Sequence, residues 1–393
     1  MTRTLLASVL LLIAVRPAAG QEIDRLQWRY QSVTWYSRFS LNATLGPVVL
    51  GKTAIFGGVY TYQNAKSSSL AAIDLTTGRS RWSVVTRKGA LGALAVGPGA
   101  IVVAAGDDVL LLDPATGRQR WRSPVRAQAL AIAGDVALAS AGDSLVALDL
   151  ATGKERWRVK AGPEPVVAGD TAFMEDGRRV RALDASSGKE RWSRPLPPGL
   201  SYVHSLRGDR LYLLGPSALG SINVKSRAVE WTVPLESALA APMTVTDDTL
   251  YFTTRDPSAS YVFRAFDPMT QKDRWRYTLE SRAPMTPVVF GPLVGTAAGA
   301  ARESFVALSR DTGSPAWRAS AGWVTVQPAF KDDVLYVAGQ GPHRLYAFKA
   351  DTGSVLWTAR LGSWPMGMAL TDDGTLLVSA DNLTLYAYRT SPF

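Results

Sequence analysis

The chain is 393 residues long, and its 47% hydrophobic and 19% charged residues provide enough apolar material for a large core, which excludes a disordered chain. It contains no Cys, which excludes disulfides, thiolate nucleophiles and iron–sulfur clusters, and its two His cannot supply a three-His metal site. Lys and Arg outnumber Asp and Glu by 43 to 33, a net charge of +10 that favours an anionic partner without identifying one.

Residues 1–20 have the pattern of a cleaved signal peptide. Arg3 gives a positive start, residues 5–15 form an apolar run, and residues 18–20 are small, as a signal peptidase requires. The apolar run is too short to span a bilayer, which needs about 20 residues, and no other stretch approaches that length. Gln21 stands where a lipoprotein carries its lipidated Cys. We therefore expect a periplasmic or secreted protein whose mature chain comprises residues 21–393.

A repeat of about 40 residues organises the mature chain. Eight Trp residues mark it: Trp82, Trp121, Trp157, Trp192, Trp231, Trp275, Trp317 and Trp357. A turn signature ends four residues before each Trp, and it reads Asp-x-x-Thr-Gly at 74–78, 113–117 and 149–153, with looser copies later. Asp and Gly suit such turns because Asp bonds its neighbouring backbone and Gly tolerates a positive φ.

Each repeat reads as four short strands, because apolar runs such as residues 145–150 and 345–348 alternate with turn residues. Four strands per repeat, set around a ring, predict an all-β fold: one β-propeller of four-stranded blades, over residues 21–393. Residues 368–388 supply three strands, and the segment around Trp28 supplies the fourth, so both chain ends share one blade. The count predicts nine blades, with eight as the second choice.

The Trp residues have a structural interpretation and a functional one. Nine indoles around a ring could stack on an aromatic cofactor or on sugars. Recurrence once per blade on the outermost strand predicts instead that each indole packs between adjacent blades and donates its N–H to a backbone carbonyl. The expected docking residues are Trp28, Trp82, Trp121, Trp157, Trp192, Trp231, Trp275, Trp317 and Trp357.

Arg residues flank several of these Trp, as at Arg120 and Arg122 or Arg156 and Arg158. Strand neighbours of a buried residue point to the opposite face, so we expect these Arg near the rim of the ring. There they would protect outer strands from edge-to-edge aggregation. The alternative is a basic belt in peripheral contact with an anionic envelope surface or an acidic glycan. Export and the lack of a dense Lys/Arg cluster argue against nucleic acid.

One face of the ring is the better candidate for binding. Loops between second and third strands emerge on the same face as loops between blades, and that face collects the length variation and the aromatic residues outside the repeat. Aromatic and Arg side chains on irregular loops over a rigid scaffold favour an interaction surface. The candidate partner-binding residues are Trp35, Tyr36, Tyr60, Tyr62, Tyr202, His204, Tyr261, Trp323, His343, Arg344 and Trp364.

The pattern Ala-x-Asp-x-x-Thr-Gly-x-x-x-Trp at residues 72–82 and 147–157 resembles the tryptophan-docking repeat of the pyrroloquinoline-quinone-like (PQQ-like) β-propeller superfamily. Within that superfamily, the layout is similar to the outer-membrane assembly factor BamB family: an exported chain made only of a propeller, with an N-terminal Trp strand and an aromatic segment at 28–36. The sequence departs from that family in lacking a lipidated Cys. It also has Leu235 and Glu236, without an Arg, in the inter-blade loop where the family carries a partner-binding segment.

The resemblance implies an exported, non-catalytic, monomeric scaffold for protein–protein interaction, with envelope proteins as partners and outer-membrane β-barrel protein assembly as its setting. Two alternatives stay open: a PQQ-binding protein or quinone-dependent oxidoreductase, and a binder of envelope glycans or anionic surfaces. The superfamily's dehydrogenases need calcium ligands, a catalytic Asp and commonly adjacent Cys, and this chain has no Cys. We predict no catalytic residue, no cofactor and no metal site.

Overall fold

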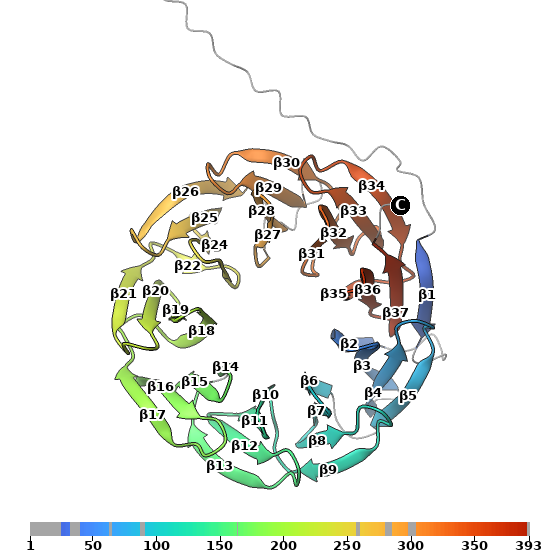
Figure 1. Ribbon diagram of the computed structural model, residues 1–393. Coiled ribbons are helices and arrows are strands. Elements are labelled where there is room, and N and C mark those ends of the chain that lie inside the picture. Colours follow the sequence, from blue (N-terminus) through green and yellow to red (C-terminus); the bar gives the residue numbers. More distant parts are fainter. Residues whose placement is uncertain are drawn as a thin grey trace, which may run out of the picture.

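The strands form a ring of nine sheets (Figure 1). The computed structural model describes residues 25–31, 40–62, 65–86, 91–162, 164–256, 260–279, 285–297 and 304–390. These residues form strands, turns and bends, and none of them belongs to a helix that could cross a membrane. The all-β class, the propeller and the count of nine blades rather than eight are confirmed.

We number the blades 1 to 9 around the ring, and in each blade the first strand lies innermost and the last outermost (Figure 1). Blade 1 is β2 (Ser40–Leu50), β3 (Thr53–Tyr62), β4 (Ala65–Asp74) and β5 (Ser80–Thr86); blade 2 is β6 (Leu91–Gly97), β7 (Ala100–Ala105), β8 (Asp108–Leu112) and β9 (Gln119–Ser123); blade 3 is β10 (Ala129–Ala133), β11 (Val136–Ala141), β12 (Ser144–Asp149) and β13 (Glu155–Lys160). Blade 4 is β14 (Val166–Ala168), β15 (Thr171–Glu175), β16 (Arg179–Asp184) and β17 (Glu190–Pro195); blade 5 is β18 (Tyr202–Arg207), β19 (Arg210–Gly215), β20 (Ala218–Asn223) and β21 (Val229–Pro234). Blade 6 is β22 (Ala238–Leu239) and β23 (Thr244–Val245), which both pair with β24 (Leu250–Arg255), then β25 (Tyr261–Asp267) and β26 (Lys272–Leu279); blade 7 is β27 (Val288–Phe290), β28 (Leu293–Ala297), β29 (Phe305–Ser309) and β30 (Pro315–Ala319). Blade 8 is β31 (Ala329–Lys331), β32 (Val334–Gly339), β33 (Arg344–Lys349) and β34 (Val355–Arg360); blade 9 is β35 (Pro365–Leu370), β36 (Thr375–Ala380), β37 (Thr384–Arg389) and β1 (Leu26–Gln31).

Both ends of the described chain meet in blade 9, as predicted. β1 pairs antiparallel with β37, with Leu26 opposite Tyr388 and Gln31 opposite Thr384. Trp28 on β1 then donates its indole N–H to the Leu75 carbonyl of blade 1 at 2.9 Å. The N-terminal strand therefore completes the last blade and ties it to the first.

Apolar cores lie between the blades, because each sheet is covered on both faces by its neighbours. All residues of β7 are buried: Ile101 and Val103 pack toward blade 1, whereas Val102 and Ala104 pack toward blade 3. Burial on both faces explains why the middle strands read as continuous apolar runs. The outermost strands, such as β13, alternate between exposed and half-buried residues because only one of their faces meets the next blade.

Antiparallel pairing gives the ring two different faces. The turn face carries the turns between first and second strands and between third and fourth strands, such as residues 134–135 and 149–153. The loop face carries the connections between second and third strands and between successive blades, such as residues 340–343 and 361–364. The regular Asp-containing turns of the repeat therefore lie on the turn face, and the connections of irregular length lie on the loop face.

Candidate functional site

The turn between third and fourth strands is built around one Asp. In blade 1, Asp74 Oδ1 accepts hydrogen bonds from the backbone N–H groups of Thr76 and Thr77, each at 3.0 Å. Asp74 Oδ2 forms an ion pair with Arg81 at 2.6 Å. The Arg81 guanidinium, followed by the Thr77 N–H, lowers the pKa of Asp74 to about 2. The turn carboxylate is therefore charged at any physiological pH.

The Gly that ends this turn receives the Trp of the preceding blade. In blade 2, Gly117 has a φ of 69° and lies against Trp82 of blade 1, which donates its Nε1–H to the Pro114 carbonyl at 2.8 Å. A Cβ on Gly117 would lie 2.6 Å from the indole ring, so both the backbone and the contact require Gly. The same contact joins Trp28 to Gly78, Trp121 to Gly153, Trp157 to Gly188, Trp275 to Gly313 and Trp317 to Gly353, and each indole donates to the equivalent carbonyl.

Three of the nine expected docking residues depart from this arrangement in the described part of the chain. Trp231 is 7% exposed and packs on Phe266, but its Nε1–H has no hydrogen-bond partner. The Trp192 ring contacts Phe173, and no hydrogen bond joins its indole to blade 5. Blade 9 has no turn for Trp357, and the Arg25 guanidinium lies over that ring at 5.7 Å instead. The expectation that every indole donates to a carbonyl is wrong at these positions.

The Arg residues that precede the Trp are ion-paired within their own blades. Arg156 lies 2.5 Å from Asp149 of its turn and 2.6 Å from Asp135 of the adjacent hairpin. Equivalent pairs join Arg191 to Asp184 and Asp170, Arg274 to Asp267 and Asp248, Arg81 to Asp74, and Arg120 to Asp113. The hairpin carboxylates thus pair with Arg, and no group of three His, Asp or Glu among the described residues could hold a metal ion. At these positions the ion pairs indicate that Arg stabilises the turns of its own blade, and they do not favour a belt of unpaired positive charge.

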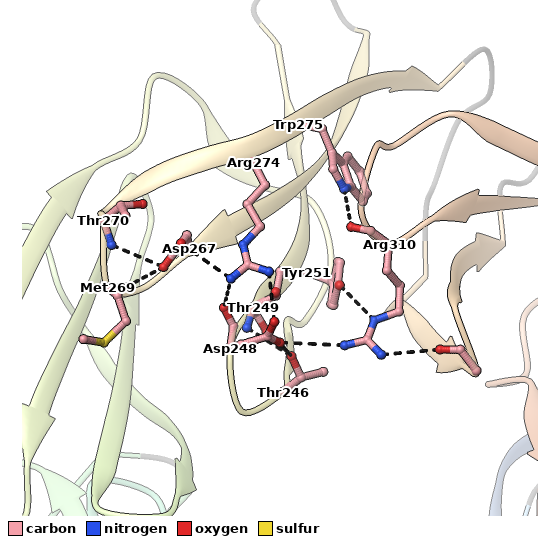
Figure 2. A network of polar contacts seen from close by, with 11 residues as sticks. Thr246, Asp248, Thr249, Tyr251, Asp267, Met269, Thr270, Arg274, Trp275 and Arg310 are labelled. Atoms are coloured by element: carbon pink, nitrogen blue, oxygen red, sulfur yellow. Dashed lines mark hydrogen bonds and ion pairs between the residues drawn. The ribbon is translucent and has the colours of Figure 1, made fainter.

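A polar network also joins blade 6 to blade 7 (Figure 2). Arg310 of blade 7 donates from Nε to the Tyr251 hydroxyl at 3.2 Å and lies 3.7 Å from Asp248. Arg274 donates to the same Asp248 carboxylate at 2.9 Å. Trp275 donates to the Arg310 carbonyl at 2.8 Å. The Arg310 carbonyl therefore accepts the hydrogen bond from the Trp275 indole of blade 6, and the Arg310 side chain contacts Tyr251 and Asp248 of the same blade.

The loop face holds an aromatic patch over blades 7 to 9. Trp323 and Trp364 are 61% and 51% exposed, and they occupy equivalent positions in successive inter-blade loops. Their carbonyls accept from the N–H groups of Gln340 at 2.6 Å and Asp381 at 2.9 Å. The His343 ring meets the Trp364 ring edge to face, with centroids 6.3 Å apart. We define the aromatic patch as Trp323, Pro342, His343, Trp364 and Met366, all of them exposed or half-buried.

The other candidate residues are dispersed. Tyr202 is 39% exposed on β18, and the half-buried His204 places Nε2 2.9 Å from the Met243 carbonyl of blade 6. Burial lowers the pKa of His204. Tyr261 is half-buried at the start of β25, and Arg344 donates to the Thr358 hydroxyl at 3.1 Å. Trp35 and Tyr36 lie outside the described residues, as do the side chains of Tyr60 and Tyr62. Leu235 is buried, and Glu236 accepts from Arg276 at 3.0 Å.

A groove of about 900 Å³ crosses the loop face between blades 2 and 3. Gly92, Gly106 and Gly142 contribute backbone to its walls, and Arg126 and Arg158 contribute charge. The search of the sequence for aromatic residues in loops did not find this groove, because none of the described residues that line it is aromatic. The clue available in the sequence was the repeated Ala-Gly-Asp in the loops at 105–107 and 141–143.

The fold and these joints define the class of protein: a closed nine-bladed β-propeller of the tryptophan-docking type, with regular turns on one face and a variable aromatic surface on the other. The chain belongs to the outer membrane protein assembly factor BamB family, whose family model matches residues 66–277 and 301–391. No curated protein sequence matches this chain.

Solved structures show the same fold at low sequence identity. BamB from Moraxella catarrhalis matches with a TM-score of 0.54 and 14% identity, covering 90% of this chain and 100% of that one. The computationally designed Ika8 protein matches with a TM-score of 0.56 and 14% identity over 77% of this chain and 96% of that one. Sqt1 from Saccharomyces cerevisiae has a TM-score of 0.56 and 9% identity over 77% and 97%. At these identities the likeness concerns the fold alone.

Proposed function

We propose that this protein is an exported, non-catalytic scaffold that binds envelope proteins through its loop face, in the assembly of outer-membrane β-barrel proteins. The observation that carries the proposal is the BamB family match over residues 66–277 and 301–391. In this proposal residues 1–20 are a signal peptide, residues 21–393 are the propeller domain, and the mature monomer works in the periplasm.

The aromatic patch supports binding on the loop face. Contiguous exposed apolar patches often mark interaction sites, and Trp is enriched among residues that dominate binding energies. The backbone carbonyls of Trp323 and Trp364 accept hydrogen bonds from the loops at 340 and 381, so little backbone conformational entropy is lost when a partner covers these residues. A rigid ring with aromatic side chains on its variable loops is suited to binding extended or folded protein surfaces.

Site-specific photo-cross-linking in the native envelope tests this proposal. A photoreactive residue at position 364 or 323 should capture a discrete envelope protein, and Trp323→Ser with Trp364→Ser should abolish co-purification of that protein. Leu356 is the matched control, because it is 37% exposed at the turn-face end of β34, the strand that leads to Trp364. Capture at position 356 but not at 364 would reject the loop face as the binding surface.

The quinone alternative has its own test. Titration of the purified protein with pyrroloquinoline quinone and Ca²⁺ should leave the quinone absorption spectrum unchanged if the protein is a scaffold. A saturable spectral change accompanied by dye reduction would make it an oxidoreductase and overturn the proposal.

A further inference from the structure

Blade 5 has an unusual position in the ring. The joint that it makes with blade 4 and the joint that it makes with blade 6 both lack the indole-to-carbonyl hydrogen bond, at Trp192 and Trp231. Among the described joints, no other blade lacks this bond on both sides. We propose that blade 5, residues 202–234, is the mobile joint of the propeller, and that it opens as a local unit while the rest of the ring stays folded.

The physical cause lies in the turns that these two indoles face. Where the other turns end in Gly, blade 5 has Arg227 and blade 6 has Gln271, with φ of 61° and 57°. Both residues keep the left-handed conformation, which a side chain disfavours. Both also carry the Cβ that would lie 2.6 Å from the ring in a joint such as Trp82 on Gly117. The indole must move off the turn, and its N–H then fails to reach the carbonyl.

Trp231 shows the consequence most clearly. Its ring packs between blades 5 and 6, and its centroid lies 5.7 Å from the ring centroid of Phe266 and 6.3 Å from that of Tyr212. Its buried N–H is left without an acceptor, and a buried donor without a partner favours any state in which water can reach it. Opening of the joint supplies that water. The same opening at the Trp121 joint would first have to break a hydrogen bond of 2.8 Å.

Several polar contacts across these two joints are exposed, although the half-buried His204 of blade 5 also places Nε2 2.9 Å from the Met243 carbonyl of blade 6. Arg194 of blade 4 donates to the Arg227 carbonyl at 2.7 Å. Arg207 pairs with Asp247 of blade 6 at 2.8 Å, with side chains 53% and 86% exposed. Ion pairs this exposed contribute little to stability and are screened by salt. By contrast, the joint between blades 6 and 7 combines a docked indole with the Arg310 network of Figure 2.

The turn face is open to solvent at the joint between blades 5 and 6. A surface pocket of about 320 Å³ lies there between the two hairpins, lined by residues that include Arg207, Asp209 and Asp247. The inner edge of blade 6 is divided into two short pieces, β22 and β23, where the other blades have one inner strand. Solvent-exposed polar contacts are a feature of segments that open locally. The inference concerns the isolated protein and does not depend on the proposed function.

Hydrogen exchange of the full mature protein, followed by mass spectrometry, tests the proposal. We expect amides of β19 and β20 to exchange on the order of tenfold faster than those of β11 and β12, the corresponding strands of blade 3. The difference should grow in about 0.5 M NaCl, because the contacts at Arg207 and Asp247 are screened. Equal protection of blades 5 and 3 in the wild-type protein would overturn the proposal.

A pair of variants tests the cause. Arg227→Gly with Gln271→Gly should raise protection of blade 5 toward that of blade 3, because both turns then accept the indole as Gly153 does. Gly153→Gln is the inverse control, and we expect it to weaken protection of blades 2 and 3 while leaving blade 5 unchanged. If the double Gly variant folds and blade 5 still exchanges as fast as in the wild-type protein, the missing docking bonds are not the cause.

Discussion

Trp82 of blade 1 lies on the Cα of Gly117 in blade 2, so closely that the indole occupies the place of a side chain that Gly117 lacks. The Trp82 ring joins the two blades because it packs on Gly117, which has a positive φ, and donates a hydrogen bond of 2.8 Å to the Pro114 carbonyl. Its recurrence explains why both a Trp and a Gly occur in nearly every repeat. Each Trp packs on the Gly of the next repeat, and its spacing from its own Gly is set by the turn and the strand between them.

Gly117→Ala should destabilise the propeller more than Gly134→Ala. Both positions have positive φ, 69° and 58°, so both substitutions incur the left-handed penalty of about 1 to 2 kcal/mol. Only at Gly117 does the new methyl group also meet an indole, which adds about 1 to 3 kcal/mol of overpacking, whereas Gly134 has no neighbour within 4 Å. Urea unfolding of both variants measures the difference. Equal losses would mean that the Trp82 contact adds nothing to the conformational requirement.

Substitution of Trp by Phe should separate a docked indole from an undocked one. Trp121→Phe loses a hydrogen bond to Leu150 and leaves that carbonyl unsatisfied, so we expect a loss of about 1 to 3 kcal/mol beyond the change in packing. Trp231→Phe removes an N–H that has no acceptor, and the gain from this removal should offset part of the lost volume. Paired chemical unfolding curves give the comparison. A larger loss at Trp231 than at Trp121 would contradict it.

Stability should fall in acid. The turn carboxylates Asp74, Asp113 and Asp149 have pKa values lowered from 3.8 to about 2, chiefly by their Arg partners. They bind protons more weakly in the folded than in the unfolded chain, so their stabilisation is complete above about pH 3.8 and is lost as the pH falls through about 2. Unfolding midpoints measured between about pH 5 and pH 2 should show this drop.

The control for this pH dependence is Asp113→Asn combined with Asp149→Asn. Asn keeps the acceptor for the turn N–H groups but has no charge to lose. The double variant should therefore be less stable than the wild-type protein near pH 5, and its midpoint should change less between about pH 4 and pH 2. Parallel curves for the two proteins over that range would exclude the turn carboxylates as the source of acid sensitivity.

The ion pair of Arg264 and Asp273 in blade 6 should behave as a buried pair. The two side chains are 8% and 10% exposed, lie 2.9 Å apart, and Arg264 also covers the Phe252 ring at 5.2 Å. Asp273→Ala leaves a buried charge without its partner, so we expect a loss of about 3 to 5 kcal/mol. Val146 holds the equivalent position in blade 3, which makes Arg264→Val the natural second change.

Arg264→Val combined with Asp273→Ala should recover part of that loss, because no buried charge is then left without its partner, while the smaller side chains leave some space unfilled. A double-mutant cycle by urea unfolding measures the coupling between the two residues. If the double variant is as unstable as Asp273→Ala alone, then the second ion pair of Asp273, with Arg276, carries the stability instead.

The candidate site was only partly predictable from sequence. Exposed aromatic residues in loops of irregular length pointed to the loop face, but the edge-to-face contact of His343 with Trp364 depends on how two blades are placed beside each other. The repeated Ala-Gly-Asp hinted at small loop residues, but the groove between blades 2 and 3 is a space between loops that are adjacent only in the folded ring. The pairing of Arg156 with both Asp149 and Asp135 was likewise hidden, since it joins two turns of one blade.

The repeat by itself determined the class, the number of blades and the closure by the N-terminal strand. These follow from local periodicity: the spacing of apolar runs sets the strands, and the turn signature and the Trp set the limits of each blade. Only the tertiary structure decided which joints carry a hydrogen bond. Arg227 and Gln271 differ from Gly in a way that is visible in sequence, but the effect falls on Trp192 and Trp231 of the preceding blades, because a docking contact is made across a joint.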